Sequence, residues 1–263
     1  MTTVELTRLT LRQNRRGALG WIIGLAALTL LYGSSFKSIG GAKSAAISSY
    51  PASLKQALNL QDLTSPVGYL NATVYGIPLL ILTSIYVVSA ATRSVAGDEE
   101  SGALDLILAY PVSRTNLVLA RMAAMIAVLV ALGLVLFVVV LLLRSPTGLS
   151  IGADKLAAQT FTWLLFACSL AGVALLISAA VGHPSNSLGI SAGVLLLAYL
   201  ADSFIPLIGG LGWVRNLSPY YWFIGSDALA SGLDLGYCAL LAGTAIVTTA
   251  LAAFALNRRD IGV

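Results

Sequence analysis

The residues best suited to chemistry gather in one charged segment, residues 93–116. Asp98, Glu99 and Glu100 follow one another there, while the single histidine of the chain, His183, stands near Asn186. An enzyme that works inside a membrane can pair glutamates with histidines to hold a metal or to activate a nucleophile. One histidine makes a poor set of ligands or bases for either task. The sequence therefore predicts no catalytic residues and no metal site in this chain.

ATP hydrolysis would require a phosphate-binding loop with the pattern Gly-x-x-x-x-Gly-Lys-Ser/Thr, whose backbone amides cradle the phosphates. The nearest approach is residues 40–44, Gly-Gly-Ala-Lys-Ser, which lack the glycine directly before the lysine. Cys168 and Cys238 both fall within apolar runs, where free cysteines usually act as small hydrophobic side chains. We therefore expect no cofactor on this chain.

Composition places these residues in a membrane. Of the 263 residues, 58% are hydrophobic and only 10% are charged, whereas a soluble domain carries about 25% charged residues. Such a chain cannot cover its surface with ionised groups, so most of that surface must face lipid. The sequence predicts an all-α integral membrane protein in which residues 1–263 form a single transmembrane domain.

Six apolar runs approach or exceed the roughly 20 residues that one transmembrane helix needs. The third run is longer than a straight span requires, so we expect it to be tilted or to extend past the bilayer. The runs cover residues 17–32, 73–91, 117–143, 156–181, 188–208 and 235–256.

Basic residues beside the span ends indicate orientation rather than nucleic-acid binding, because cytoplasmic loops are enriched in Lys and Arg. An even number of spans puts the three arginine groups on one side, so both termini are predicted to be cytoplasmic. Lys37, Lys43 and Lys55 on the opposite side weaken the asymmetry but are spread along a longer loop. The arginine groups are Arg8, Arg12, Arg15 and Arg16; Arg93, Arg114 and Arg121; and Arg258 and Arg259.

Three segments outside the spans have their own expected structure. Residues 1–16 fit an amphipathic helix that lies at the membrane surface, or else the ordinary basic flank of a first span. Residues 37–70 include a short amphipathic helix with Pro51 in its first turn. Residues 203–234 mix Gly, Pro and aromatic residues, which favours a partly re-entrant hairpin or a pair of interfacial helices on the outer face, or else a plain loop of interfacial aromatic residues.

The charged segment itself predicts a short helix between spans 2 and 3. Asp98 can cap that helix, with Glu99 and Glu100 in its first turn opposing the helix dipole. Its apolar face is predicted from Leu104, Ile107 and Leu108 at helical spacing. Tyr110-Pro111 ends the helix, and Ser113 can cap the third span. The apolar face either meets a partner protein or packs on the spans of this chain.

Residues 99–114 closely resemble the signature of type-2 ABC exporter permeases. That signature joins an acidic residue and glutamate, a small residue, Gly-Thr-Leu, further leucines and Pro-Val-Ser-Arg. This chain has Glu99-Glu100, Ser-Gly-Ala-Leu, and Pro-Val-Ser-Arg114, with Ala103 in place of the usual threonine. The order of the basic start, the six spans and the broken aromatic segment also agrees with the family over essentially the whole length.

The resemblance implies one permease subunit of a bacterial ATP-driven exporter in the plasma membrane. It would pair with a second permease, identical or homologous, and with two cytoplasmic ATPase subunits that carry ATP and Mg²⁺. Residues 93–116 would form the coupling loop, and residues 1–16 with Arg8, Arg12, Arg15 and Arg16 the connecting helix. The residues assigned by the resemblance to the ATPase-coupling site are Asp98, Glu99, Glu100, Leu104, Ile107, Leu108 and Arg114.

The spans offer weaker signals. Gly20 with Gly24, and Gly189 with Gly193, permit close helix approach, either within the subunit, which we favour, or across a permease dimer. Asp202 and Arg121 stand near span ends, where snorkelling to the interface is expected. The spans contain no row of carboxylates or histidines that would carry protons. These features favour a hydrophobic or amphipathic cargo such as a drug, an antibiotic or a lipid-like molecule.

Two other functions compete with transport. An intramembrane protease would depend on His183, and it would need an arginine spacing after the glutamates that is missing here. A passive assembly or immunity factor would show no dependence on an ATPase.

Overall fold

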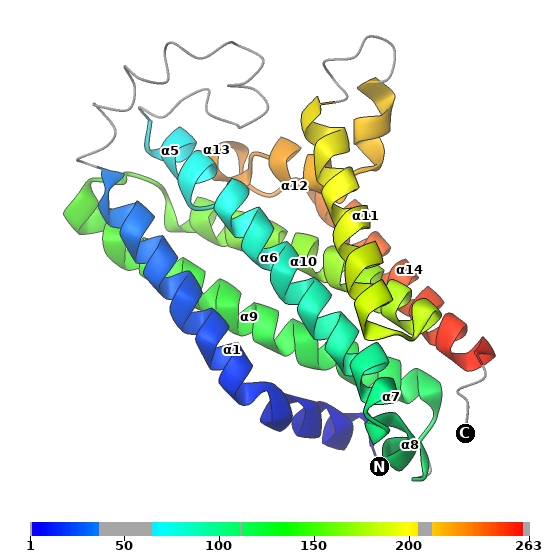
Figure 1. Cartoon of the computed structure of the whole chain (residues 1–263). Coiled ribbons are helices and arrows are strands. Elements are labelled where there is room, and N and C mark those ends of the chain that lie inside the picture. Colours follow the sequence, from blue (N-terminus) through cyan, green and yellow to red (C-terminus); the bar gives the residue numbers. More distant parts are fainter. Residues whose placement is uncertain (1, 37–64, 111, 205–211, 260–263) are drawn as a thin grey trace.

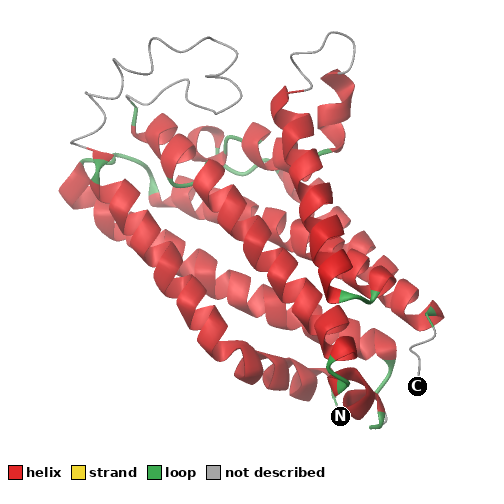
Figure 2. Ribbon diagram, viewed as in Figure 1, coloured by secondary structure: helices red, strands yellow, loops and turns green. Residues whose placement is uncertain are grey.

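The computed structural model describes residues 2–36, 65–110, 112–204 and 212–259. All regular structure within these ranges is helical (Figure 2). The short helix expected at Pro51 and the three outer lysines lie outside the described residues.

Six helical segments are long and apolar enough to cross a membrane, and each contains all or most of one predicted run. The prediction of six spans is therefore confirmed. The second segment is built from several pieces, since Gly76 and Pro78 interrupt it near one end. The segments are α1 (Thr3–Ser34); α5 (Pro66–Thr73), α6 (Ile77–Thr92), η1 (Arg93–Gly97) and α7 (Asp98–Glu100); α9 (Arg114–Thr147); α10 (Ala153–Val181); α11 (Pro184–Phe204); and α14 (Leu235–Arg258).

The basic start is helical, but it is continuous with the first span rather than a separate helix. Thr2 and Glu5 form a capping box, in which the Thr2 hydroxyl accepts the Glu5 amide proton and the Glu5 carboxylate accepts that of Thr2. Figure 1 shows that the first turns of α1 bend away from the axis of the rest. The amphipathic segment and the span are thus two parts of one bent helix.

Helix α10 lies at the centre of the bundle and packs against α6, α9, α11 and α14, while α1 packs mainly on α9. Trp163 of α10 is almost completely buried, and its indole nitrogen donates a hydrogen bond to the Thr83 hydroxyl of α6 at 3.0 Å. Gly172 allows the close contact with α14, because an added Cβ would lie 3.1 Å from the Ala245 carbonyl oxygen and would collide with the Thr248 hydroxyl.

Short helices cover one end of the bundle, α12 (Pro219–Gly225) and α13 (Ala228–Ser231) among them. They follow η3 (Gly212–Leu217), so the segment expected to be broken is indeed irregular. Tyr220 and Phe223 of α12 are buried, and each ring lies 5.0 Å from the ring of Phe166. Helix α12 therefore packs among α10, α11 and α14 instead of lying free as a surface loop.

Both ends of the described chain lie at the other end of the bundle, beside α7 and α8 (Ala103–Leu108), as Figure 1 shows. The arginines that precede the first span, flank the loop between the second and third, and follow the last are therefore on one side. This is the arrangement that an even number of spans requires.

Gly172→Val should loosen the contact between α10 and α14, because overpacking a tight helix contact costs about 1–3 kcal/mol. Gly243→Val is the matched control: it lies on α14, and an added Cβ there meets no described atom within 4 Å. Thermal unfolding of the purified protein should show a lower midpoint for Gly172→Val alone. Equal midpoints for the two variants would contradict the packing described.

Candidate functional site

The charged segment forms a helical corner at the end of the bundle that carries both termini. The second span runs on through η1 and α7, and the chain then reverses at Gly102, whose φ of 72° is the left-handed conformation that glycine adopts without strain. Helix α8 follows, and Ser113 caps α9 by accepting the amide proton of Asn116, as predicted. The corner is therefore joined directly to the second and third spans.

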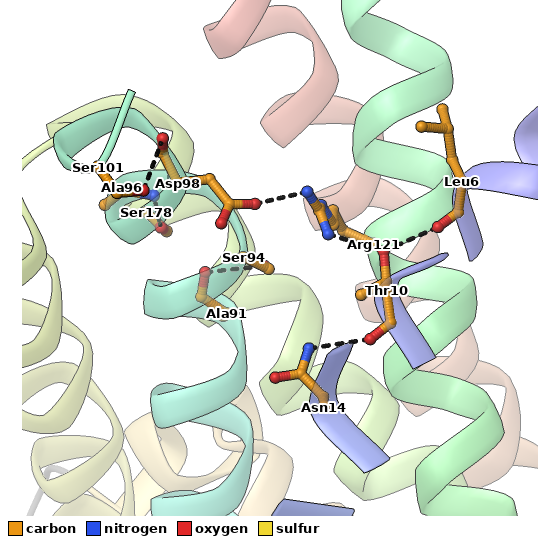
Figure 3. Close-up of polar contacts among 10 residues, drawn as sticks. All are labelled: Leu6, Thr10, Asn14, Ala91, Ser94, Ala96, Asp98, Ser101, Arg121 and Ser178. Atoms are coloured by element: carbon orange, nitrogen blue, oxygen red, sulfur yellow. Dashed lines mark hydrogen bonds and ion pairs between the residues drawn. The ribbon is translucent and has the colours of Figure 1, made fainter. Parts of the chain in front are cut away.

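Arg121 of α9 is the centre of a buried polar network (Figure 3). Its side chain is 4% exposed and contacts Asp98 of α7 at 2.5 Å and the Thr10 hydroxyl of α1 at 2.7 Å. The Thr10 hydroxyl in turn donates to the carbonyl of Leu6, and Asn14 donates to the Thr10 carbonyl. One guanidinium thus ties the start of α1 to α7 and α9.

The expectations for three charged residues are wrong here. Asp98 does not cap a helix, because the helix continues through Gly97 and the carboxylate turns instead to Arg121. Arg121 does not snorkel to the interface, because its partners hold it inside the protein. Asp202, also expected to snorkel, has a side chain that is only 9% exposed and lies 4.0 Å from Arg215.

A second group of ties fastens the corner to the end of α14. Glu99 forms an ion pair with Arg259, which also donates to the Ala179 carbonyl of α10. Arg114 donates to the carbonyl oxygens of Leu256 at 3.0 Å and Arg259 at 2.6 Å. Glu99 and Arg114 therefore serve to join the corner to the last span within this chain.

Helix α8 has an inner and an outer face. Leu104 is completely buried and Ile107 packs partly buried on the core, so these two attach the helix to this chain. The side chain of Leu108 lies outside the described residues. Leu106 on the outer face is 73% exposed, and Tyr110, which follows the helix, is 59% exposed. Asp105 of α8 and Glu100 of α7 are also exposed.

Sequence reasoning missed Leu106 and Tyr110 as surface residues. It selected Leu104, Ile107 and Leu108 by their helical spacing. Leu104 and Ile107 proved to lie on the face that packs against this chain itself. The sequence signal that could have identified Leu106 is its position directly after Asp105, because this places an apolar side chain within the acidic part of the segment.

The remaining predicted residues take no part in the contacts described for this corner. Arg8, Arg12, Arg15 and Arg16 are all exposed on α1. An added Cβ at Gly20, Gly24, Gly189 or Gly193 would meet no described atom within 4 Å. We favoured packing of these glycines within the subunit, but no other described helix packs closely against them. His183 is exposed.

A largely apolar groove of about 440 Å³ lies between α6 and α11. Its lining includes Ile81, Ile85 and Leu196. Its main polar feature is the pair of hydroxyl groups of Ser84 and Tyr220, which are joined by a hydrogen bond of 2.8 Å. Tyr220 reaches this groove from α12, which lies at the end of the bundle opposite the termini.

Six spans, an apolar groove and a charged helical corner define a multi-pass membrane protein of the transporter-permease class. Residues 6–257 match the family described as "Multidrug efflux system permease Rv1217c, C-terminal domain", and the chain belongs to that family. A search of curated proteins found no match.

Replacing Arg121 by Gln should lower the free energy of unfolding by about 3–5 kcal/mol, because Asp98 would be left without its cation in a partly buried site. Arg121→Gln combined with Asp98→Asn should recover part of that loss. Denaturant unfolding of the two single variants and the double variant measures the coupling, and Arg12→Gln on the exposed face of α1 is the control. Additive losses would show that the pair does not act as a unit.

Proposed function

We propose that this chain is the membrane subunit of an ATP-driven exporter in the plasma membrane, with both termini in the cytoplasm. Two cytoplasmic ATPase subunits would supply the energy, and ATP and Mg²⁺ would bind on them. A second permease, identical or homologous, would complete the pathway. No catalysis is assigned to this chain.

The observation that carries this proposal is the two-sided construction of α8. Its inner face is anchored by Leu104, while Leu106 and Tyr110 point outward from a corner that ion pairs join to α9 and α14. A force applied to the outer face would be passed to both spans, because the connections are direct ion pairs in partly buried positions. An exposed leucine and tyrosine flanked by carboxylates also suit a protein groove with a basic rim.

The cargo is proposed to be hydrophobic or amphipathic and to use the groove between α6 and α11. The lining is apolar, so it favours molecules that leave water readily. Alternating access would follow if ATP binding moves the corner and the spans attached to it. ATP on the partner subunits can drive such a change only through its different affinity for the two states.

The open glycines support a second permease at the membrane-facing surface of the bundle. Gly20 and Gly24 on α1, and Gly189 and Gly193 on α11, have room for another helix to approach.

Leu106→Arg should abolish productive contact with the ATPase while leaving the fold intact, because Leu106 is exposed. We expect the affinity for a co-purified ABC ATPase to fall at least tenfold, a loss typical of an interface hot spot. Pull-down and ATP turnover in lipid nanodiscs measure the effect. Leu233→Arg, at an exposed leucine near the other end of the bundle, is the control.

Glu100→Ala in the same experiment tests the exposed carboxylate at the end of α7. Normal complex formation and turnover in both loop variants would refute coupling through α8. Failure of any ABC ATPase to bind the wild type would refute the exporter itself.

Ala192→Phe should obstruct the groove, since Ala192 is part of its lining. The expected result is a loss of the stimulation of ATP turnover by a hydrophobic dye such as rhodamine 6G, with basal turnover unchanged. Leu197→Phe is a suitable control, because Leu197 is exposed on the same helix and does not line the groove. Equal stimulation in both variants would place the cargo elsewhere.

A further inference from the structure

A second cavity, of about 260 Å³, lies between the bent start of α1 and the neighbouring parts of α6, η1 and α9. It sits directly beside the Arg121 network, which Figure 3 shows between Thr10 and Asp98. It shares the Arg121 network with the corner, but its lining includes neither a residue of α8 nor one of the groove for cargo.

On all three walls the charged and amide side chains of the lining lie toward the same end, with Leu11 of α1 as an apolar residue among them. On α1, Gln13 and Asn14 precede Trp21 by about two turns. On the second span, Arg93 stands two turns from Tyr86, and the rings of Trp21 and Tyr86 meet edge to face at 5.7 Å.

The third wall follows the same order. On α9, Arg121 lies about two turns from Val128, and Met125 stands between them. The cavity is therefore amphipathic, with its polar part toward the end of the bundle that carries the termini and its apolar part toward the membrane interior.

The polar part favours an anion. Among the described lining residues, two are cationic, Arg93 and Arg121, and none is acidic. Asp98 balances the charge of Arg121 from outside the lining, whereas the exposed guanidinium of Arg93 forms no ion pair with another described residue. The Nε–H group of Arg121 is buried and has no hydrogen-bond partner among the described residues.

We propose that this cavity binds the phosphate headgroup of an anionic phospholipid, such as phosphatidylglycerol, from the leaflet next to the termini. Arg93 supplies the charge, Asn14 and Gln13 supply amide donors, and the unpaired Nε–H of Arg121 becomes a further donor. The first part of the acyl chains lies along Trp21, Met125 and Val128.

A lipid fits this site better than a soluble anion does. Inorganic phosphate would use the polar part alone and leave the aromatic and aliphatic part without a partner. The neighbouring arginines of α1 are exposed at the same end and would concentrate anionic lipid around the opening. A bound lipid would join α1 to the second and third spans and thereby stabilise the bend of α1.

The test is lipid binding by the delipidated full-length chain in detergent. Native mass spectrometry counts bound phosphatidylglycerol, and titrations that follow the thermal unfolding midpoint give affinities. Phosphatidylcholine, inorganic phosphate and glycerol 3-phosphate are titrated in parallel. We expect one saturable phosphatidylglycerol site, with weaker phosphatidylcholine binding and no comparable shift with either soluble phosphate.

Arg93→Gln should weaken phosphatidylglycerol binding by about tenfold, as expected for losing a charge-assisted hydrogen bond. Gly17→Leu should weaken it by occupying the cavity without a change of charge, since Gly17 belongs to the lining. Arg258→Gln, a matched charge change on α14 away from the cavity, should have no effect.

Three results would overturn the proposal. Unchanged binding in Arg93→Gln and Gly17→Leu would show that lipid binds only as a nonspecific annulus. Equal weakening in Arg258→Gln would indicate a general charge effect. A shift of equal size with inorganic phosphate would identify a site for soluble anions. None of these results depends on an ATPase, so they leave the exporter proposal untouched.

Discussion

The buried contact between Arg121 and Asp98 is the constraint on which this end of the molecule depends. A guanidinium that is 4% exposed requires an anion beside it, and among the described residues Asp98 of the α7 corner provides it at 2.5 Å. The need to neutralise that charge therefore fixes where the corner lies against α9. Thr10 completes the network, which draws the start of α1 to the same point.

The consequence is a corner that moves with several spans. Asp98 pairs with Arg121 of α9, and Glu99 pairs with Arg259, which follows α14. Leu104 anchors α8 through its buried side chain. These contacts are specific and partly charged, so they favour one discrete arrangement over a range of loose ones. A rigid connection of this kind is what a proposed coupling element needs, because a flexible loop would absorb the movement of a partner.

Much of the fold was predictable because it depends on local properties. Apolar runs of membrane length predicted the six spans. The start of α9 was predicted because Ser113 is a residue type that caps helices and stands before an apolar run. The role of Asp98 was not predictable in the same way. A cap is a local interaction, whereas the partner that Asp98 uses is 23 residues away and becomes available only when the spans pack.

The face of α8 shows a related limit. Helical spacing identifies a stripe of leucines, but it does not say whether that stripe is buried by the chain itself or by another protein. Leu104 proved to be buried within the chain, and Leu106 on the other side proved to be exposed. The family resemblance supplied the location of the proposed coupling segment, and the packing supplied which of its side chains are available to a partner.

The most direct test of the account is photo-crosslinking from α8 in a complex with an ABC ATPase. A photoreactive amino acid replaces Leu106 in one variant and Leu233, near the opposite end of the bundle, in another. The account predicts that position 106 crosslinks to the ATPase and that position 233 does not. A stable, ATP-hydrolysing complex in which position 106 gives no crosslink would contradict the claim that the outer face of α8 receives the force.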